Sequence, residues 1–393
     1  MNMQAGHRDA HFRIPTSAVY VTAITIALIV LLELAARIVE YATFKTPTTA
    51  TLEHMRIGRL PEADQLKAEH RFWGNYMRHD PYLVYSPIPG WSGRYTHFNS
   101  LGFRGAEVSA RKPAQVLRVA VLGGSTAFGA FVKDERTFPA VLQDLLDAHL
   151  AEGSSQESGS RVEVVNAAVP GYVSTQEVIA LQLKLLSLAP DLVIVFDGLN
   201  DVFVLGSPLR GTTRMEEWES QCTMPLSQRI RRSMMASSAL LRAAQGVKSA
   251  VALRRQQPEP TWELPPGRFD DSVSVYLGNL KSMLAVLKSR NIAALTIIQP
   301  ARLWSISELE MQAATHIPIE RVRAMRAMHD VMKHAAADIT GQPDMVSNML
   351  DLDDIGAVPG SFIEDDDIHL TEAGSRAVAA RIADFLVTHD NRF

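Results

Sequence analysis

Cysteine is almost absent from this 393-residue chain, and the single one, Cys222, has no second cysteine with which to pair. A disulfide-stapled scaffold is therefore excluded, and so is a structural zinc site built from several thiolates. A marked excess of charge of one sign is also missing, since 39 basic residues against 43 acidic ones leave a net charge of -4. Nucleic-acid-binding domains usually carry a strong basic excess. We expect a chain that folds by packing its apolar residues, which make up 47% of the sequence, and that binds no nucleic acid.

Charged side chains are missing from residues 18–32, where the sequence reads AVYVTAITIALIVLL. Continued through residue 36, this run is close to the ~20 residues that a helix needs to cross a bilayer. We predict a cytoplasmic tail over 1–17 and a transmembrane helix or signal anchor over 18–38, with the remaining chain periplasmic or extracellular. A cleavable signal peptide is the alternative, because the uncharged core is short and small residues follow it.

The segment 39–114 mixes charged patches with the turn-rich sequence SPIPGWSGRYTHFNSLGFRG. One interpretation is a lead-in, that is, a linker with an edge element packed against the main domain. The other gives Asn99 or Arg104 a part at the mouth of a site.

Beyond residue 114 short apolar runs alternate with helical patterns, which is typical of a parallel sheet covered on both faces. We predict this α/β domain over 115–390. Its expected strands are 117–122, 162–169, 192–196 and 294–298. Its expected helices are about 139–150, 174–188, 272–289, 320–339 and 372–388.

No strand pattern is present at about 202–270, which we interpret as a helical insertion after the third strand. Within it, residues 221–258 hold seven bases and no acid, interleaved with apolar residues. Such an amphipathic basic segment could lie on anionic headgroups or bind an acidic polymer, and it could equally be a solvated lid helix.

Ligands of such sheets bind beyond the carboxyl ends of the strands. The first strand is followed by Gly123-Gly124-Ser125. Gly124 and Gly129 have the spacing of a phosphate-binding loop, but position 130 is alanine where that loop needs lysine. What remains is a serine presented on a tight turn.

The next two strand ends add hydrogen-bond donors. Gly171 follows the second strand and allows its N–H to approach a ligand closely. Asn200 follows the third strand, and its amide can donate into the same space.

A histidine stands after an acidic run near the C-terminus, in the sequence EDDDIHLT at 364–371. Asp366 can accept from the Nδ1–H of His369, which leaves Nε2 to take a proton from a serine. Asp365 and Asp367 are the alternative carboxylates. The acidic run could also be a cation site or an inert surface turn.

The order of these four segments resembles the SGNH/GDSL hydrolase superfamily, with the usual GDS written here as Gly-Gly-Ser. The resemblance covers about 117–386 apart from the insertion, and it implies a three-layer α/β/α sandwich with a flavodoxin-like parallel sheet. The roles it implies are Ser125 as nucleophile, Asp366 and His369 as its triad partners, and the Ser125 N–H, the Gly171 N–H and the Asn200 side chain as the oxyanion hole. It implies no metal and no cofactor.

Three functions remain open from the sequence. The first is a serine esterase that removes an acyl group, such as O-acetyl, from an envelope carbohydrate or lipid. The second is an O-acyltransferase to a polysaccharide that uses the same triad. The third is a non-catalytic anchored scaffold. The intact chemical groups at separate strand ends argue against it, because a scaffold does not need them.

Overall fold

The computed structural model describes two compact units of the chain, which are taken separately here. They comprise Met1–Leu60 with Met224–Glu259, and Pro61–Thr223 with Pro260–Phe393. The described residues are 16–44, 66, 69, 76–152, 161–203, 238, 240, 266–315, 317–341, 347–363 and 366–393. The predicted tail lies almost entirely outside the described residues, and so does most of the predicted insertion, including Cys222.

The first unit contains α1 (Thr16–Phe44), an apolar helix whose Val19–Val39 stretch is long enough to cross a membrane. The predicted N-terminal helix is thus confirmed, while its insertion into a membrane stays a prediction. Glu33 does not stand alone within this helix. It accepts a hydrogen bond from Arg37 Nε at 2.8 Å and another from Ser238 Oγ at 2.7 Å, which reduces the cost of an acid near an apolar environment.

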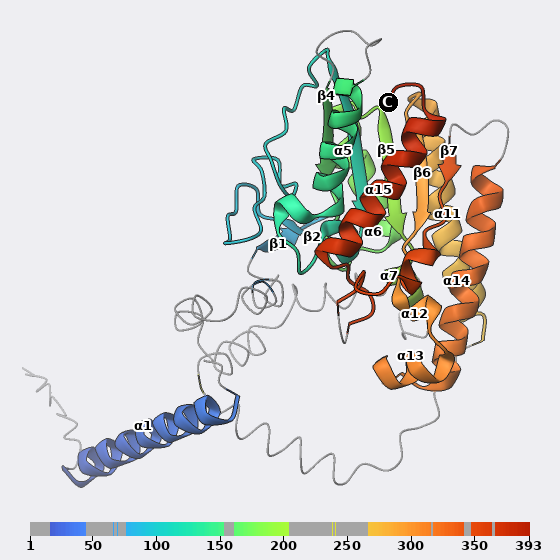
Figure 1. Cartoon of the computed structure of the whole chain (residues 1–393). Coiled ribbons are helices and arrows are strands. Elements are labelled where there is room, and N and C mark those ends of the chain that lie inside the picture. The colour runs from blue at the N-terminus through green and yellow to red at the C-terminus, as the bar shows by residue number, and fades with distance from the viewer. Residues whose placement is uncertain are drawn as a thin grey trace, which may run out of the picture. The chain divides into compact units, whose positions relative to one another are not determined.

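The second unit is built on a five-stranded parallel sheet in the order β4-β3-β5-β6-β7 (Figure 1). Its strands are β3 (Val116–Gly123), β4 (Arg161–Asn166), β5 (Leu192–Asp197), β6 (Ala293–Ile298) and β7 (Ser347–Met349). The predicted α/β class and four strands are confirmed. The second predicted strand extends three residues too far, because regular pairing with β3 ends at Asn166. A polar three-residue strand such as β7 gives no apolar signal, and the sequence did not predict it.

Helices cover both faces of this sheet (Figure 1). The elements are α5 (Phe138–Glu152) and α15 (Glu372–His389) on one face, and α6 (Ser174–Ala180), α11 (Arg268–Ser289) and α14 (Ile319–Thr340) on the other. Successive side chains of a strand point to opposite faces. Accordingly Val119 and Val121 pack in the core with α5, while Ala120 and Leu122 pack in the core with α11.

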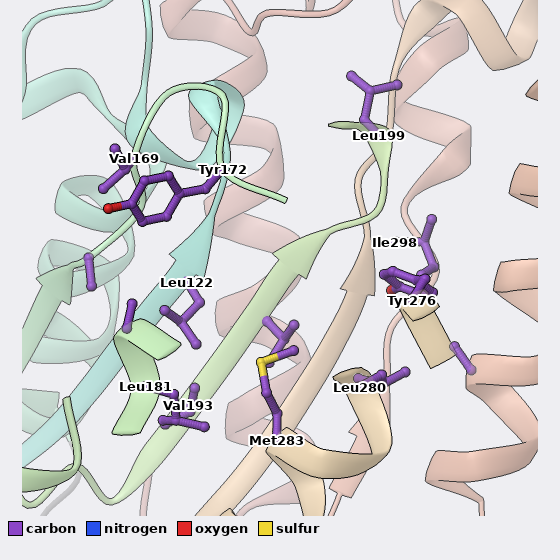
Figure 2. Packing of buried hydrophobic residues seen from close by; sticks show 14 of the residues in the cluster. Leu122, Val169, Tyr172, Leu181, Val193, Leu199, Tyr276, Leu280, Met283 and Ile298 are labelled. Atoms are coloured by element: carbon purple, nitrogen blue, oxygen red, sulfur yellow. The ribbon is translucent and has the colours of Figure 1, made fainter. Parts of the chain in front are cut away.

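The core beneath α11 joins residues from strands and helices. Figure 2 shows Leu122 and Val193 of neighbouring strands, with Leu181 and Met283 packed over them. Burying such a side chain contributes about 1.5–3 kcal/mol relative to leaving it exposed. This packing fixes the strand ends, and with them the loops that carry the polar residues.

The predicted helix over 174–188 changes its pitch along its length. It begins as α6, widens into one π-helical turn at Leu181–Leu185 and tightens into a 3-10 turn at Leu186–Leu188. The following Ala189 has a left-handed backbone, with φ 50°, and ends the segment. The apolar spacing therefore predicted the extent of the element but not its internal geometry.

Residues 39–44 of the predicted lead-in continue α1, and the described part of the lead-in beyond residue 60 packs within the second unit. It contains the antiparallel strands β1 (Met77–Asp80) and β2 (Val84–Pro87). Asn99 is 3% exposed, and its Oδ1 accepts from Leu101 N and Phe103 N at 3.0 and 2.9 Å. Asn99 thus stabilises a turn, which favours the structural interpretation of this segment over a role at a site mouth.

The edge strand β4 would expose unpaired backbone groups, and α5 satisfies two of them. Val162 N donates to Asp147 Oδ1 at 2.6 Å, and Val164 N donates to Gln143 Oε1 at 2.9 Å. Capping an edge strand in this way stabilises it and hides a template for intermolecular pairing.

Replacing Asp147 with alanine is expected to lower the free energy of unfolding by about 1–2 kcal/mol, because Val162 N–H loses its acceptor. Urea denaturation of the full chain in detergent measures this change. Asp144→Ala on an exposed position of the same helix is the matched control. Equal effects of the two substitutions would contradict this account of the edge.

Candidate active site

Three predicted side chains meet at the carboxyl edge of the sheet. Ser125 begins the short helix α4 (Ser125–Phe128) directly after β3. Its Oγ lies 2.8 Å from Nε2 of His369, which precedes α15. On the other side of the imidazole, Nδ1 lies 2.8 Å from Asp366 Oδ1 and 3.0 Å from Oδ2. The arrangement lets a proton pass from the hydroxyl to the imidazole while the carboxylate holds the ring.

The structure distinguishes Asp366 from its neighbour Asp367. Asp366 Oδ1 also accepts from Ile368 N and His369 N at 3.1 and 2.8 Å, so the carboxylate folds back over its own turn. Asp367 has a left-handed backbone with φ 59° and instead accepts from Arg302 Nη1 at 2.6 Å. Asp365 lies outside the described residues.

The environment of Asp366 keeps it ionised. Burial raises the pKa of its carboxyl group, but hydrogen bonds from the His369 side chain and from the two backbone N–H groups outweigh burial. The pKa of Asp366 is therefore lower than usual, and the group is a carboxylate at neutral pH.

The glycine turn before Ser125 leaves no room for side chains. A Cβ at Gly123 would lie 2.3 Å from Phe196 O on β5, and a Cβ at Gly124 would lie 2.4 Å from Asn200 Nδ2. The two glycines therefore let β3 and the serine turn approach β5 and the Asn200 amide. Ser125 is the first residue of α4, where a backbone N–H has no carbonyl partner one turn earlier.

The two other predicted oxyanion donors lie on adjoining segments. Asn200, on α7 (Leu199–Phe203), donates from Nδ2 to Tyr172 O at 2.8 Å, and the second hydrogen of that amide has no acceptor among the described residues. Gly171 precedes Tyr172 and has φ 81°, a left-handed conformation that favours glycine. The structure thus brings the Gly171 loop, Asn200 and the serine turn together.

The lead-in hairpin holds the Gly171 loop from outside. Tyr85 OH donates to Pro170 O at 2.8 Å, and Tyr172 OH donates to Tyr85 O at 2.6 Å. Both tyrosines are buried, and their rings meet edge to face. The segment before the sheet therefore contributes to the geometry of the candidate oxyanion hole.

Arg104 supports the turn on the other side of Ser125. Its buried guanidinium donates to Phe128 O at 2.9 Å, Gly129 O at 2.8 Å and Val132 O at 2.7 Å, and it pairs with Asp134 at 2.6 Å. These contacts occupy Arg104 with the backbone beyond α4, so it braces the turn instead of facing a substrate.

The sequence did not predict a buried polar bridge between two loops of the site. It joins the serine turn, residues 123–126, to the histidine loop, which carries Asp366 and His369. Gln299 Nε2 donates to Thr126 Oγ1 at 2.8 Å, and Thr126 Oγ1 lies 3.3 Å from its acceptor, Ile368 O. Gln299 directly follows β6, so inspecting the end of that strand as well would have found it. In addition, the edge of the Phe131 ring meets the His369 ring at a centroid distance of 5.0 Å.

The histidine loop is also fixed at its far end. Thr371 caps α15, because its Oγ1 accepts from Gly374 N at 3.1 Å. Removing such a cap typically costs about 1 kcal/mol.

A cavity of about 430 Å³ lies beside this region but does not contain the three meeting side chains. Its lining includes His97, Asp134, Asp144 and Asn166, between the lead-in and α5. Within the described residues, no group of three or more His, Cys, Asp or Glu side chains could hold a metal ion.

Comparisons with solved structures find similar chains among ester hydrolases. A lipase/acylhydrolase from Enterococcus faecalis is 17% identical, with 68% of this chain and 94% of that chain covered and a TM-score of 0.36. An acetylxylan esterase from Geobacillus stearothermophilus is 14% identical, with 69% and 92% covered and a TM-score of 0.38. A putative lipolytic protein of the G-D-S-L family from Desulfitobacterium hafniense DCB-2 is 12% identical, with 68% and 98% covered and a TM-score of 0.38.

No curated protein matches this chain. A family model does match it, over residues 121–377, and that model describes the GDSL-like lipase/acylhydrolase family. The match begins within β3 before Ser125 and ends within α15 beyond His369, so it spans the segments that carry the candidate triad and the candidate oxyanion donors, but not the lead-in. Because these residues make up more than half of the sequence, the chain belongs to the GDSL-like lipase/acylhydrolase family and is a hydrolase that acts on ester bonds.

Proposed function

We propose that this protein is a membrane-anchored serine esterase in which Ser125, His369 and Asp366 form the catalytic triad. The observation that carries the proposal is the 2.8 Å approach of Ser125 Oγ to His369 Nε2, with Asp366 on the opposite ring nitrogen. A scaffold without catalysis would have no need of this alignment.

The first half-reaction acylates the serine. His369 Nε2 takes the Ser125 proton as Oγ attacks the carbonyl carbon of the ester, and the Asp366 carboxylate stabilises the imidazolium that forms. The imidazolium then protonates the leaving alcohol. In the second half-reaction His369 activates a water molecule, which releases the acyl group from Ser125.

The negative charge of the tetrahedral intermediate is received by the N–H groups of Ser125 and Gly171 and by Asn200 Nδ2. Each such donor is worth on the order of 3 kcal/mol of transition-state stabilisation. The contacts that support this assignment are the hydrogen bond from Asn200 to Tyr172 O and the tyrosine pair that clamps the Gly171 loop.

The proposed substrate class is an ester of envelope carbohydrate or lipid. The helix α1 is long and apolar enough to cross a membrane, and Arg8 and Arg13 precede it in the sequence. Because basic residues favour the cytoplasmic side, the proposal puts the hydrolase domain outside the cytoplasm, next to envelope carbohydrate and lipid. One of the similar structures is an acetylxylan esterase, so O-acetyl carbohydrate esters are the substrates to test first. Product analysis with a sugar acceptor present distinguishes release of acetate from its transfer to the sugar.

Ser125→Ala should abolish turnover of a short-chain aryl ester, with a loss of roughly a thousandfold or more, because the nucleophile is removed. It should also abolish labelling by a fluorophosphonate probe. Ser187→Ala, at an exposed position, is the matched control and should leave both unchanged. Retained activity in Ser125→Ala would refute the assignment.

Asp366→Asn should lower kcat by roughly a hundredfold or more, since the neutral amide no longer stabilises the imidazolium. Asp367→Asn should cost much less, because Asp367 pairs with Arg302 and not with the histidine. Steady-state kinetics at neutral pH compare the two variants. A larger loss at Asp367 would overturn the choice of carboxylate.

Asn200→Ala should lower kcat by roughly a hundredfold with little change in KM, because the lost donor acts mainly in the transition state. Circular dichroism and thermal melting serve as controls for folding. A rise in KM at unchanged kcat would show instead that Asn200 binds the ground state.

A further inference from the structure

Three carboxylic acids lie buried beneath the candidate oxyanion donors. Glu177 comes from α6, Asp197 ends β5 and Asp201 belongs to α7, and these side chains are 0%, 3% and 6% exposed. The charged and titratable groups that act on the pair of Glu177 and Asp197 are the third acid, Asp201, and the hydroxyl of Tyr276 on α11. None of these groups, which act on Glu177 and Asp197 from the described residues, is a cation.

The hydrogen bonds that other residues donate to these three acids do not reach every carboxyl oxygen. Asp201 accepts from Ser174 Oγ at 2.6 Å and from Ser174 N, and Asp197 Oδ1 accepts from Tyr276 OH at 2.8 Å. Apart from the carboxyl groups of this pair, no described residue donates an N–H or O–H to either oxygen of Glu177 or to Oδ2 of Asp197.

A proton held between the carboxyl groups of Glu177 and Asp197 satisfies these oxygens. A hydrogen bond between the carboxyl groups of Glu177 and Asp197 raises the pKa of Glu177 and lowers that of Asp197, and such a bond requires that one of the two be protonated. Two buried carboxylates in contact would leave uncompensated charges, which costs several kcal/mol. A bound cation is the other conceivable neutraliser, but the described residues include no group of acids arranged to hold a metal ion.

The acidities of the two groups agree with a retained proton. Burial raises the pKa of Glu177 well above its usual value, and the charges of Asp197 and Asp201 raise it further. Burial also raises the pKa of Asp197, to about 7, with Asp201 adding to the effect. In an unfolded chain both would ionise near pH 4.

The pair joins the two segments that carry oxyanion donors. Glu177 lies on α6, which follows the Gly171 loop directly, and Asp197 lies three residues before Asn200. The hydrogen bonds from Ser174 to Asp201 form a second link between the same segments. Tyr276 and Asn279 of α11 close the cluster from below, since Asn279 Nδ2 donates to Ser174 Oγ at 2.9 Å.

We propose that Glu177 and Asp197 share a proton, and that this buried hydrogen bond holds the Gly171 loop and Asn200 at the spacing that the oxyanion requires. Glu177 and Asp197 are thus positioning residues, which act through Gly171 and Asn200 without touching substrate. The inference rests on the proposed function, because it assigns the oxyanion hole to those donors.

The test compares two substitutions of Glu177 in the full chain. Glu177→Gln keeps a donor toward Asp197 but has no proton to lose, whereas Glu177→Leu keeps the approximate volume and removes the donor. Glu308→Gln replaces a partly exposed glutamate on α13 (Glu308–Thr315) and is the matched control. The readouts are kcat and KM for a short-chain aryl ester across pH, with Ser125→Ala as the blank for spontaneous hydrolysis.

We expect Glu177→Gln to keep kcat within about twofold of the unsubstituted protein at pH 7, and Glu177→Leu to lose on the order of tenfold or more in kcat at similar KM. On the alkaline side, kcat of the unsubstituted protein should fall as the pair loses its last proton. Glu177→Gln should hold its kcat to higher pH, because its donor does not titrate.

A stability measurement tests the proton without catalysis. A raised folded-state pKa gives stability that is fully present below the unfolded value of about 4 and is lost as pH rises through the folded value. The free energy of unfolding of the unsubstituted protein should therefore fall between about pH 4 and the pKa of Asp197 near 7, and the fall should be smaller in Glu177→Gln.

The two proposals fail in different ways. Equal activity of the unsubstituted protein and Ser125→Ala would refute the proposed function and leave the stability slope untouched. The shared proton would be refuted if Glu177→Gln lost as much kcat as Glu177→Leu, or if it kept the full stability slope. It would also be refuted if added calcium stabilised the protein, chelation reversed that effect and Glu177→Gln abolished it, since a cation would then lie between the carboxylates.

Discussion

The close approach of β3 to β5 is the constraint on which the site depends. These strands are neighbours in the sheet, and β3 is followed by a turn that contains two glycines. Phe196 O lies where a Cβ atom of Gly123 would be, and Asn200 Nδ2 lies where a Cβ atom of Gly124 would be. Any larger residue at Gly123 would push the serine turn away from backbone that cannot yield, because β5 is buried on both faces. The turn therefore brings Gly124 against Asn200 and Tyr172 O, and it points the Ser125 hydroxyl at a histidine far along the chain.

Buried polar contacts then fix what surrounds the serine. Arg104 braces the backbone beyond α4, the bridge from Gln299 through Thr126 reaches the histidine loop, and Tyr85 clamps the segment before α6. Each contact pairs groups that would cost about 1–3 kcal/mol if they were buried unsatisfied. The loops around the site are thus held by hydrogen bonds between distant segments, and the lead-in belongs to this framework as much as the sheet does.

The sequence predicted those elements and site residues that are marked by a pattern of neighbouring residues. Apolar runs located four strands, and glycine, asparagine and histidine at strand and helix ends located the residues that the structure brings together. Burial of polar residues was beyond such reasoning: Glu177 is an acid at an ordinary helix position, and only the packing of α6 against β3 and α11 takes it out of water. Likewise, an arginine in a turn-rich segment is expected at the surface. Arg104 is buried because its guanidinium donates to backbone carbonyl groups that follow it by more than twenty residues, which no local pattern indicates. The strand β7 is too short and polar for its pattern to stand out.

The central claim is that Ser125 becomes covalently acylated during ester hydrolysis. Rapid acid quenching of the full chain with a short-chain aryl ester, followed by tryptic mass mapping, tests it directly. Cleavage after Arg118 and Lys133 gives the peptide 119–133, which contains Ser125. The account predicts the added mass of the acyl group on this peptide, assigned by fragmentation to Ser125, with its absence in Ser125→Ala. Turnover with the acyl group on another residue, or with no acylated peptide when deacylation is slowed, would contradict it.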